Sequence, residues 1–179
     1  RGGLYKAWGP QLLLGTDVSG KTLGIVGLGR IGSRVAEHAV RGFGMKVLYT
    51  DIKPSPEFSA EGGPAKMSAF GGEKEYGAVF VEKLEELLPQ CDFVSLHVPL
   101  LDSTRHLIND ATLKLMKPTA YLINTSRGAI IDEKALAAAL AGGVIRGAAI
   151  DVFEFEPVIT PELKQLENII LTPHIASAT

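Results

Sequence analysis

The segment Leu23-Gly24-Ile25-Val26-Gly27-Leu28-Gly29-Arg30-Ile31-Gly32 decides the fold. Its first part, Leu23–Leu28, is a short apolar run typical of a central strand in a parallel sheet. In the G-x-G-x-x-G pattern that follows, Gly27 permits a tight turn, Gly29 lets a pyrophosphate approach the backbone, and Gly32 lets a helix pack closely on the strand. The segment therefore predicts a dinucleotide-binding strand–turn–helix unit.

Residues on either side of this turn extend the predicted cofactor site. The first-turn N–H groups of the helix, near Arg30 and Ile31, and the helix dipole favour a phosphate. Asp51 lies 19 positions after Gly32, at the end of the next predicted strand, where a carboxylate accepts from ribose hydroxyls and repels a 2′-phosphate. We therefore expect NAD rather than NADP, although the nearby Lys53 softens this preference. The alternative is a glycine turn that binds no ligand.

The rest of the chain alternates apolar, strand-like runs with helical ones. Predicted strands are Leu23–Leu28, Val47–Thr50, Phe93–Leu96, Ala120–Ile123, Ala148–Val152 and Ile169–Leu171. Predicted helices run from the glycine turn to Gly42 and Gly44, over Leu84–Leu88 with Pro89 as the stop, over Asn109–Met116, and over 133–141 with Asp132 as N-cap. This order predicts an α/β fold of the Rossmann type, a doubly wound parallel sheet. The Pro54–Gly77 segment is predicted to be a mobile or inserted loop.

The composition limits the classes of function. The 179 residues, 46% of them hydrophobic, suffice for one domain with a core. A formal net charge of −2 without a block of like charges gives no indication of nucleic acid or a membrane as partner. No run approaches the roughly 20 apolar residues of a membrane span, and no cluster has metal-ligand spacing. The single Cys91 excludes an internal disulfide and is predicted to be a small buried hydrophobe.

Three chemically distinct side chains follow the last three predicted strands. Arg127, Glu156 and His174 each come shortly after an apolar run, and the carboxyl ends of parallel strands meet at the edge of the sheet that binds ligands. An arginine can hold a carboxylate in a planar, bidentate contact. An imidazole can transfer a proton near neutral pH. Together with the dinucleotide turn, this set predicts hydride transfer on a small oxoacid.

Five segments, taken in order, resemble the nucleotide-binding domain of the D-isomer-specific 2-hydroxyacid dehydrogenases. They are Gly27–Gly32, His97–Leu100, Asn124–Gly128, Asp151–Pro157 and Thr172–Ser177, and the likeness runs from Ser19 to Ala178. Within the family, Trp8, Pro10 and the stretch Leu14–Gly24 are similar to glyoxylate/hydroxypyruvate reductases. Asp51–Glu57 is similar to phosphoglycerate dehydrogenases, so both branches stay open.

The resemblance implies a role for each residue at the strand ends. Arg127 would bind and polarise the oxoacid, His174 would be the general acid and base, and Glu156 would orient His174 and stabilise its protonated form. Asp151 would bind the nicotinamide carboxamide. The cofactor-binding set is then Gly27, Gly29, Arg30, Ile31, Gly32, Asp51, His97, Val98, Pro99, Thr125, Ser126 and Asp151.

Each assignment has a structural alternative. Arg127 by itself would be an exposed loop arginine, His174 a capping or core histidine, and Glu156 a solvated charge. Glu154 competes with Glu156 as the partner of His174, and His97 is equally well a structural histidine. The histidines without catalytic context, predicted to lie at the surface, are His38 and His106.

The resemblance also predicts the organisation of the protein. Residues 1–179 would form one NAD-binding domain, with 1–18 as a linker or packing segment, and the substrate-binding domain would be absent from this chain. The full-length protein would be a cytoplasmic homodimer that passes a hydride between nicotinamide and a D-2-hydroxyacid or its oxoacid, such as glyoxylate or hydroxypyruvate. Two alternatives stay open. One is a non-enzymatic NAD(H)-sensing module like the family's corepressors. The other is a different NAD-dependent enzyme of similar fold, such as a formate dehydrogenase, against which the Arg127–Glu156–His174 set argues.

Overall fold

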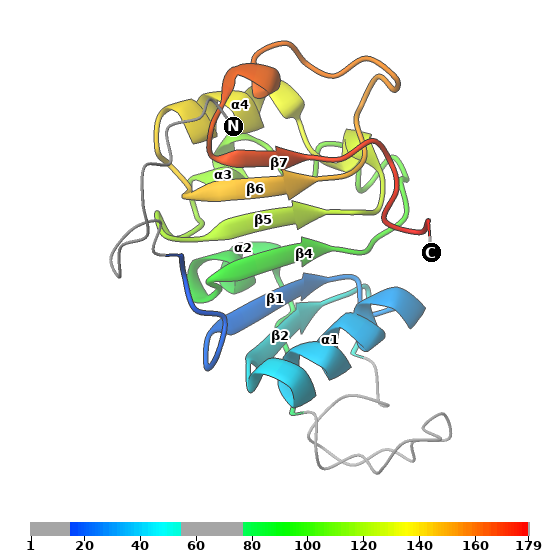
Figure 1. The fold of residues 1–179 in the computed structure, drawn as a ribbon. Helices are drawn as coiled ribbons and strands as arrows, with labels where there is room; N and C mark the ends of the chain where they lie inside the picture. The colour runs from blue at the N-terminus through cyan, green and yellow to red at the C-terminus, as the bar shows by residue number, and fades with distance from the viewer. Residues whose placement is uncertain (1–14, 55–76, 179) are drawn as a thin grey trace.

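The fold is built on one sheet of seven strands, all parallel, in the order β3-β2-β1-β4-β5-β6-β7 (Figure 1). The computed structural model describes residues 15–54 and 77–178. The strands are β1 (Thr22–Val26), β2 (Lys46–Thr50), β3 (Val79–Phe80), β4 (Phe93–Leu96), β5 (Tyr121–Asn124), β6 (Gly147–Ile150) and β7 (Ile169–Leu171). The strand order reverses between β1 and β4, which is the switch point where doubly wound sheets bind ligands. The predicted fold class is confirmed.

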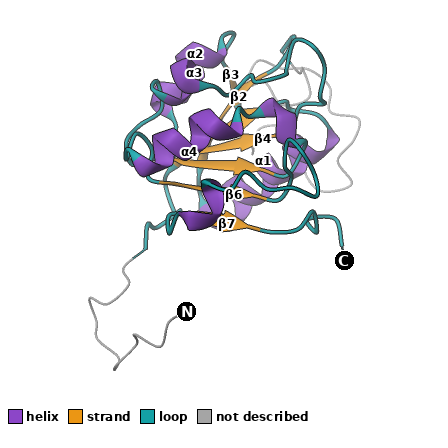
Figure 2. Ribbon diagram, turned by 90° about the horizontal axis from the view of Figure 1, so that it is seen from above, coloured by secondary structure: helices purple, strands orange, loops and turns teal. Residues whose placement is uncertain are grey.

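Helices cover both faces of this sheet. The α-helices are α1 (Arg30–Phe43), α2 (Leu84–Leu87), α3 (Asp110–Leu113) and α4 (Glu133–Ala141), and three 3-10 turns are η1 (Leu88–Gln90), η2 (Gly128–Ile130) and η3 (Leu163–Gln165). Helix α1 lies on one face beside β1 and β2, whereas α2, α3 and α4 lie on the other (Figures 1 and 2). This division is what right-handed crossovers from a central β1 produce.

Two separate cores follow from the alternation of side chains along the strands. In β1, Leu23 and Ile25 point towards α1 and join a small core. Val26 points the other way and joins the larger core beneath α2, α3 and α4. Cys91 lies wholly buried in this larger core, and its burial raises the pKa of the thiol to about 12. The prediction that Cys91 is a buried hydrophobe is confirmed.

Two glycines of the G-x-G-x-x-G turn are required by packing. Gly27 has φ +92°, and a Cβ there would lie 2.8 Å from Val98 Cγ1. A Cβ on Gly32 would lie 2.2 Å from the Gly27 carbonyl oxygen. A side chain at Gly32 would therefore force α1 away from the strand, and one at Gly27 would be strained and would press against the segment that follows β4. The strand ends at Val26 rather than at the expected Leu28 because the backbone already turns at Gly27.

Most predicted elements are confirmed within a residue or two, and the exceptions have local causes. The prediction missed β3, because two residues give no periodic signal. Helix α2 ends at Leu87, one residue before the predicted end at Leu88, and Pro89 follows within the 3-10 turn η1, where a proline needs no N–H. The helix predicted over Asn109–Met116 is shorter in the structure: α3 covers Asp110–Leu113, with Asn109 as its N-cap. The residues up to Met116 form tight turns instead. Gly42 lies inside α1, and Gly44 in the left-handed region ends that helix. The Pro54–Gly77 segment lies almost entirely outside the described residues.

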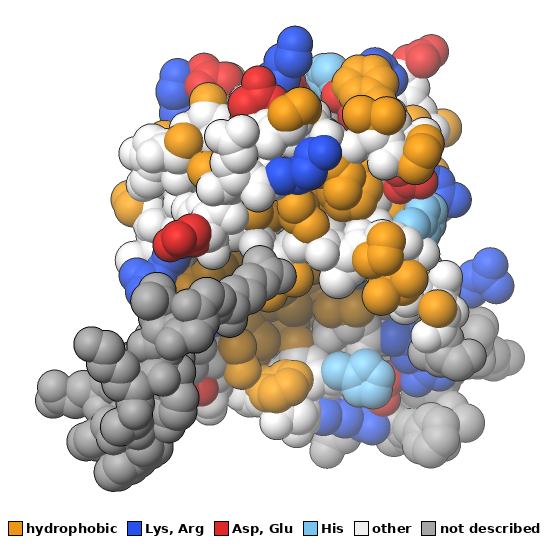
Figure 3. Space-filling model, turned by 45° about the horizontal axis from the view of Figure 1, so that its top comes forward, with side chains coloured by type: hydrophobic (Ala, Val, Ile, Leu, Met, Phe, Trp, Pro, Cys, Tyr) orange, Lys and Arg blue, Asp and Glu red, His pale blue; other side chains and the backbone are white. Residues whose placement is uncertain are grey.

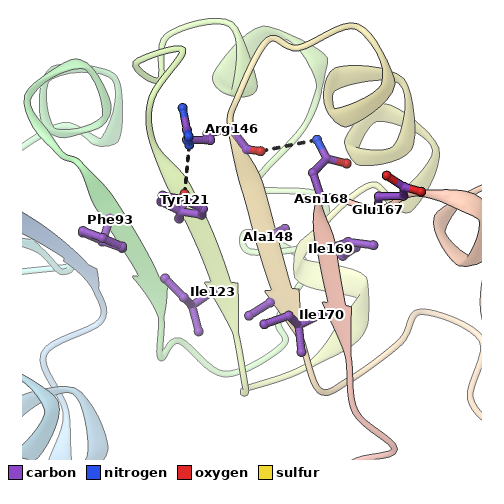
Figure 4. Close-up of a pocket in the computed structure, with 10 residues that line it drawn as sticks. Phe93, Tyr121, Ile123, Arg146, Ala148, Glu167, Asn168, Ile169 and Ile170 are labelled. Carbon is purple, nitrogen blue, oxygen red and sulfur yellow. Dashed lines mark hydrogen bonds between the residues drawn. The ribbon is translucent and has the colours of Figure 1, made fainter. Parts of the chain in front are cut away.

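One part of the sheet carries no helix among the described segments. On the α1 side, Phe93, Tyr121 and Ile123 help to line a hollow over β4–β7 (Figure 4). Hydrophobic side chains gather in this hollow (Figure 3). Tyr121 accepts a hydrogen bond of 3.0 Å from Arg146 Nε at its rim, and Thr16 Oγ1 lies 3.2 Å from the same hydroxyl. Most of the predicted linker or packing segment, residues 1–18, falls outside the described residues. No helix in residues 15–54 and 77–178 is long and apolar enough to cross a membrane.

Candidate active site

The loops that follow β5, β6 and β7 carry Arg127, Glu156 and His174, so all three lie beyond the carboxyl ends of neighbouring strands. The structure brings two of them into direct contact: His174 Nδ1 lies 3.1 Å from Glu156 Oε2. The side chains of His174 and Glu156 are 49% and 38% exposed. The pair is therefore ordered by its own contact yet open to a small molecule from outside.

Glu156 is itself held in place by the backbone. Its Oε1 accepts a hydrogen bond of 3.0 Å from Phe153 N–H, which leaves Oε2 for His174. The pKa of Glu156 lies below its ordinary value, first because of the Phe153 N–H and then because of His174, with a smaller contribution from the charge of Arg127. Glu156 is therefore ionised at neutral pH, and Arg127 is close enough for its charge to act on it.

The loop that carries His174 is tied to Asp151, a carboxylate that is 4% exposed. Asp151 Oδ1 accepts from Thr172 Oγ1 at 2.5 Å and from Ile175 N–H at 3.0 Å, and Oδ2 accepts from Ala176 N–H at 2.8 Å. Burial alone would raise the pKa of Asp151, but these three donors outweigh it and lower the pKa overall. His174 has φ +54°, a left-handed conformation that costs a non-glycine residue about 1 kcal/mol. The Asp151 contacts, with the bond of 2.8 Å from His174 N–H to the Asp151 carbonyl, hold the His174 backbone in that conformation.

Arg127 is positioned by a fully buried amide. Asn124 Oδ1 accepts from Ser126 N–H at 3.0 Å and lies 3.0 Å from Ser126 Oγ, while Asn124 Nδ2 donates to the Arg127 carbonyl at 3.0 Å. The Arg127 guanidinium is exposed and donates to the Ser126 carbonyl at 2.6 Å. The loop therefore has a fixed backbone and presents a cation that can turn towards an anion.

The β5 and β6 loops touch through Gly128. A Cβ on Gly128 would lie 1.9 Å from the Phe153 carbonyl carbon and 2.4 Å from Glu154 N. Only a glycine permits this backbone contact, which places the Arg127 loop directly against the loop that carries Glu156. The sequence motif around Arg127 contains this glycine, but sequence reasoning did not predict the contact.

At the cofactor turn, Gly29 differs from the other two glycines. A Cβ on Gly29 would meet nothing within 4 Å, and its φ of −77° suits any residue. Protein packing gives no reason for a glycine here, whereas a ligand at the helix N-terminus would need the space. Ile31 is 69% exposed beside this turn and is open to a ligand there. These features fit a dinucleotide pyrophosphate.

Other residues of the predicted cofactor set also have structural contacts. Asp51 Oδ2 accepts from Leu28 N–H at 2.8 Å, so this carboxylate braces the glycine turn in addition to any contact with a ribose. His97 Nε2 lies 2.9 Å from Ser95 Oγ, and burial lowers the pKa of His97. Val98 packs against Gly27, as described above, and Pro99 and Thr125 are exposed.

Glu154, the alternative partner of His174, has other partners in the structure. Glu154 accepts from Arg105 Nη2 at 2.9 Å and lies 2.8 Å from His106 Nε2, so it is not the partner of His174. His106 was predicted to be a surface residue, but it is half-buried and paired with Glu154. His38 is exposed, as predicted. Within the described ranges, no group of three or more His, Cys, Asp or Glu side chains is placed to hold a metal ion.

A doubly wound sheet with a glycine turn at its switch point defines this chain as an α/β dinucleotide-binding domain. The chain belongs to the D-isomer specific 2-hydroxyacid dehydrogenases, whose NAD binding domain matches residues 3–176. The predicted family and NAD as its cofactor are thereby confirmed.

Individual relatives agree with this assignment. Glyoxylate reductase of Thermococcus litoralis is 50% identical over 96% of this chain and 47% of its own length. A glyoxylate reductase structure from Paecilomyes thermophila has a TM-score of 0.80 at 40% identity, over 95% of this chain and 47% of that chain. The NAD-complexed D-isomer specific 2-hydroxyacid dehydrogenase of Lactobacillus delbrueckii ssp. bulgaricus has a TM-score of 0.75 at 32% identity, over 97% and 51%. The chain thus spans about half the length of the curated relatives it matches.

Proposed function

We propose that this chain is the NAD-binding domain of an oxidoreductase that transfers a hydride between nicotinamide and a D-2-hydroxyacid or its oxoacid, with glyoxylate or hydroxypyruvate as substrate. The observation that carries the proposal is the 3.1 Å contact between His174 and Glu156, with Arg127 beside it and the glycine turn on the same edge of the sheet. Relatives named glyoxylate reductase support the choice of substrate.

The chain's own residues divide the work of reduction. Bound NADH would supply the hydride. Glu156 holds Nδ1 of His174, which leaves Nε2 to donate a proton to the substrate oxygen at C2. The ionised Glu156 stabilises the imidazolium before that transfer. Arg127 would bind the substrate carboxylate through its guanidinium, and Asp151 keeps the His174 loop fixed throughout.

The organisation of the protein is part of the same proposal. Residues 1–179 form one domain, residues 1–18 link or pack it, and a second domain supplies the contacts that select the substrate side chain. The ratio of lengths between the chain and its relatives supports this. The homodimer and the cytoplasmic location are proposed from the family resemblance. The lack of a nucleic-acid or membrane partner is proposed from the formal net charge of −2 without a block of like charges.

The test is oxidation of NADH and NADPH by the full-length protein that carries this chain, with glyoxylate, hydroxypyruvate, phosphohydroxypyruvate and pyruvate. We expect turnover with NADH on glyoxylate or hydroxypyruvate. Preference for phosphohydroxypyruvate would move the protein to the other branch of the family. NADH binding without turnover on any oxoacid would contradict the proposal and favour the NAD(H)-sensing module.

Gly29→Ala is expected to raise the dissociation constant for NADH at least about tenfold, because the new methyl group occupies the space that the pyrophosphate would fill. Thermal stability should change little, since nothing lies within 4 Å of that methyl group. Fluorescence titration with NADH and a thermal melt measure the two effects. Gly32→Ala is the contrasting variant and should lower the melting temperature itself. If Gly29→Ala binds NADH as tightly as the wild type, the pyrophosphate does not lie at this turn.

Glu156→Gln is expected to lower kcat for oxoacid reduction about tenfold. The Glu156 carboxylate fixes Nδ1 of His174 and stabilises the imidazolium that donates the proton, whereas a neutral amide stabilises it less. Steady-state oxidation of NADH measures kcat, with Glu154→Gln as the matched control because Glu154 pairs with Arg105 and His106 instead. An unchanged kcat in Glu156→Gln would exclude the pairing.

A further inference from the structure

Glu133 is the most deeply buried carboxylate near the candidate site, and neither the motifs nor the mechanism assigns it a task. It is 2% exposed and lies in the first turn of α4. Its two oxygens accept from Glu154 N–H at 2.6 Å, from Thr160 N–H at 3.4 Å and from the Thr160 hydroxyl. A buried charge is retained only where such donors compensate it.

The three donors belong to Glu154 and Thr160, the first and last residues of the loop 154–160. Within this loop, Val158 N–H donates to the Phe155 carbonyl at 2.8 Å. Glu156 lies at the tip of this loop. The Glu133 carboxylate thus closes the base of the loop that carries the partner of His174.

We propose that Glu133, together with Thr160, is a positioning residue: it fixes the 154–160 loop so that Glu156 meets His174. This inference rests on the proposed function, because Glu156 matters to the reaction through His174. It assigns a role to a residue that touches neither the substrate nor the cofactor site.

The position of Glu133 favours a positioning role over a purely packing role. The helix dipole stabilises a glutamate in the first turn of a helix, but this stabilisation does not require burial or contacts with a loop. Both oxygens of Glu133 instead face the β6 loop. A loose base would let Glu156 leave Phe153 N–H and His174, the two contacts that chiefly lower its pKa.

The sign of one measurement separates positioning from simple electrostatics. Removing the negative charge of Glu133 would by itself lower the pKa of Glu156, because a nearby like charge disfavours ionisation. Loosening the loop would raise that pKa towards its ordinary value. We expect Glu133→Gln to raise it, which a through-space effect does not explain.

Thr160→Val makes the same test without changing any charge. We expect the pKa of the Glu156 carboxyl, followed by carbon NMR titration of the full-length protein, to rise, and kcat for oxoacid reduction to fall about tenfold with an unchanged dissociation constant for NADH. Thr160→Ser keeps the hydroxyl and should restore both values. Thr119→Val, an exposed threonine before β5, is the matched control and should change neither.

The outcomes distinguish this inference from the proposed function. If His174→Ala raises the pKa of Glu156 but Thr160→Val and Glu133→Gln do not, the pair exists and the positioning role is wrong. If His174→Ala leaves that pKa unchanged, the pair itself is wrong and the proposed function loses its central contact. If the pKa of Glu156 rises in Thr160→Val while the wild type reduces no oxoacid, Glu133 and Thr160 position Glu156 as inferred, and the proposed function is wrong.

Discussion

His174→Ala is expected to lower kcat for oxoacid reduction by about 10²–10⁴-fold, the range that a positioned general acid contributes. The imidazole of His174 lies at the carboxyl edge, is paired with Glu156 and is open to a substrate, with 49% of its side chain exposed. The dissociation constant for NADH should stay within about twofold, because binding energy comes mainly from the glycine turn and helix α1. Single-turnover NADH oxidation and fluorescence titration measure the two quantities separately.

The matched control for this variant is His38→Ala. His38 lies exposed on α1, outside the three loops of the candidate site. Its replacement should leave kcat unchanged. A His174→Ala protein that reduces oxoacids at the wild-type rate would remove the imidazole from the mechanism.

Gly128→Ala is expected to lower the free energy of unfolding by about 3 kcal/mol, because an added methyl group must displace packed backbone. A Cβ at Gly128 would lie 1.9 Å from the Phe153 carbonyl carbon, closer than any relaxation of side chains can relieve. For a domain of this size that destabilisation corresponds to a melting temperature lower by roughly 6–12 °C. The displaced backbone carries Arg127 on one side and Glu156 on the other, so kcat should fall as well.

Gly42→Ala is the appropriate control for Gly128→Ala. Gly42 lies within α1, and a Cβ there would meet nothing within 4 Å. An alanine in a helix is favoured over glycine by roughly 0.5–1 kcal/mol, so stability should rise slightly. If Gly128→Ala melted like Gly42→Ala, the two loops would not be in the contact described.

The architecture was predictable from the sequence because its signals are local and repeated. Apolar runs such as Phe93–Leu96 and Ile169–Leu171 coincide with β4 and β7, and Asp132 caps α4 as its place before an alanine-rich helix indicates. Strand β3 was not predictable, since its two residues, Val79 and Phe80, are defined as a strand by their pairing with β2 and have no periodicity of their own. Tertiary contacts likewise decide where α3 ends.

The candidate site was predictable in its parts but not in its support. The sequence shows that Arg127, Glu156 and His174 each follow a strand. It also offered Glu154 as an alternative partner of His174, but Glu154 pairs with Arg105 and His106 instead. The contacts by which Asn124 and Glu133 support the site could not be predicted from the sequence. Asn124 acts through its complete burial, and Glu133 accepts from donors more than 20 residues along the chain. Asp151 shows the same limit: its carboxylate braces residues 172–176 across 21 or more positions.

We propose that hydride reaches the substrate under acid catalysis by His174, and an experiment that follows the hydride itself tests this. The full-length protein is given NADH deuterated at C4 on either face, together with glyoxylate, and the deuterium at C2 of the product is measured by mass spectrometry. We predict one deuterium per product molecule from one face of NADH, and loss of this transfer in His174→Ala with NADH still bound. Two results would contradict this proposal: unlabelled product with each of the two deuterated forms of NADH, or equal transfer rates in the wild type and His174→Ala.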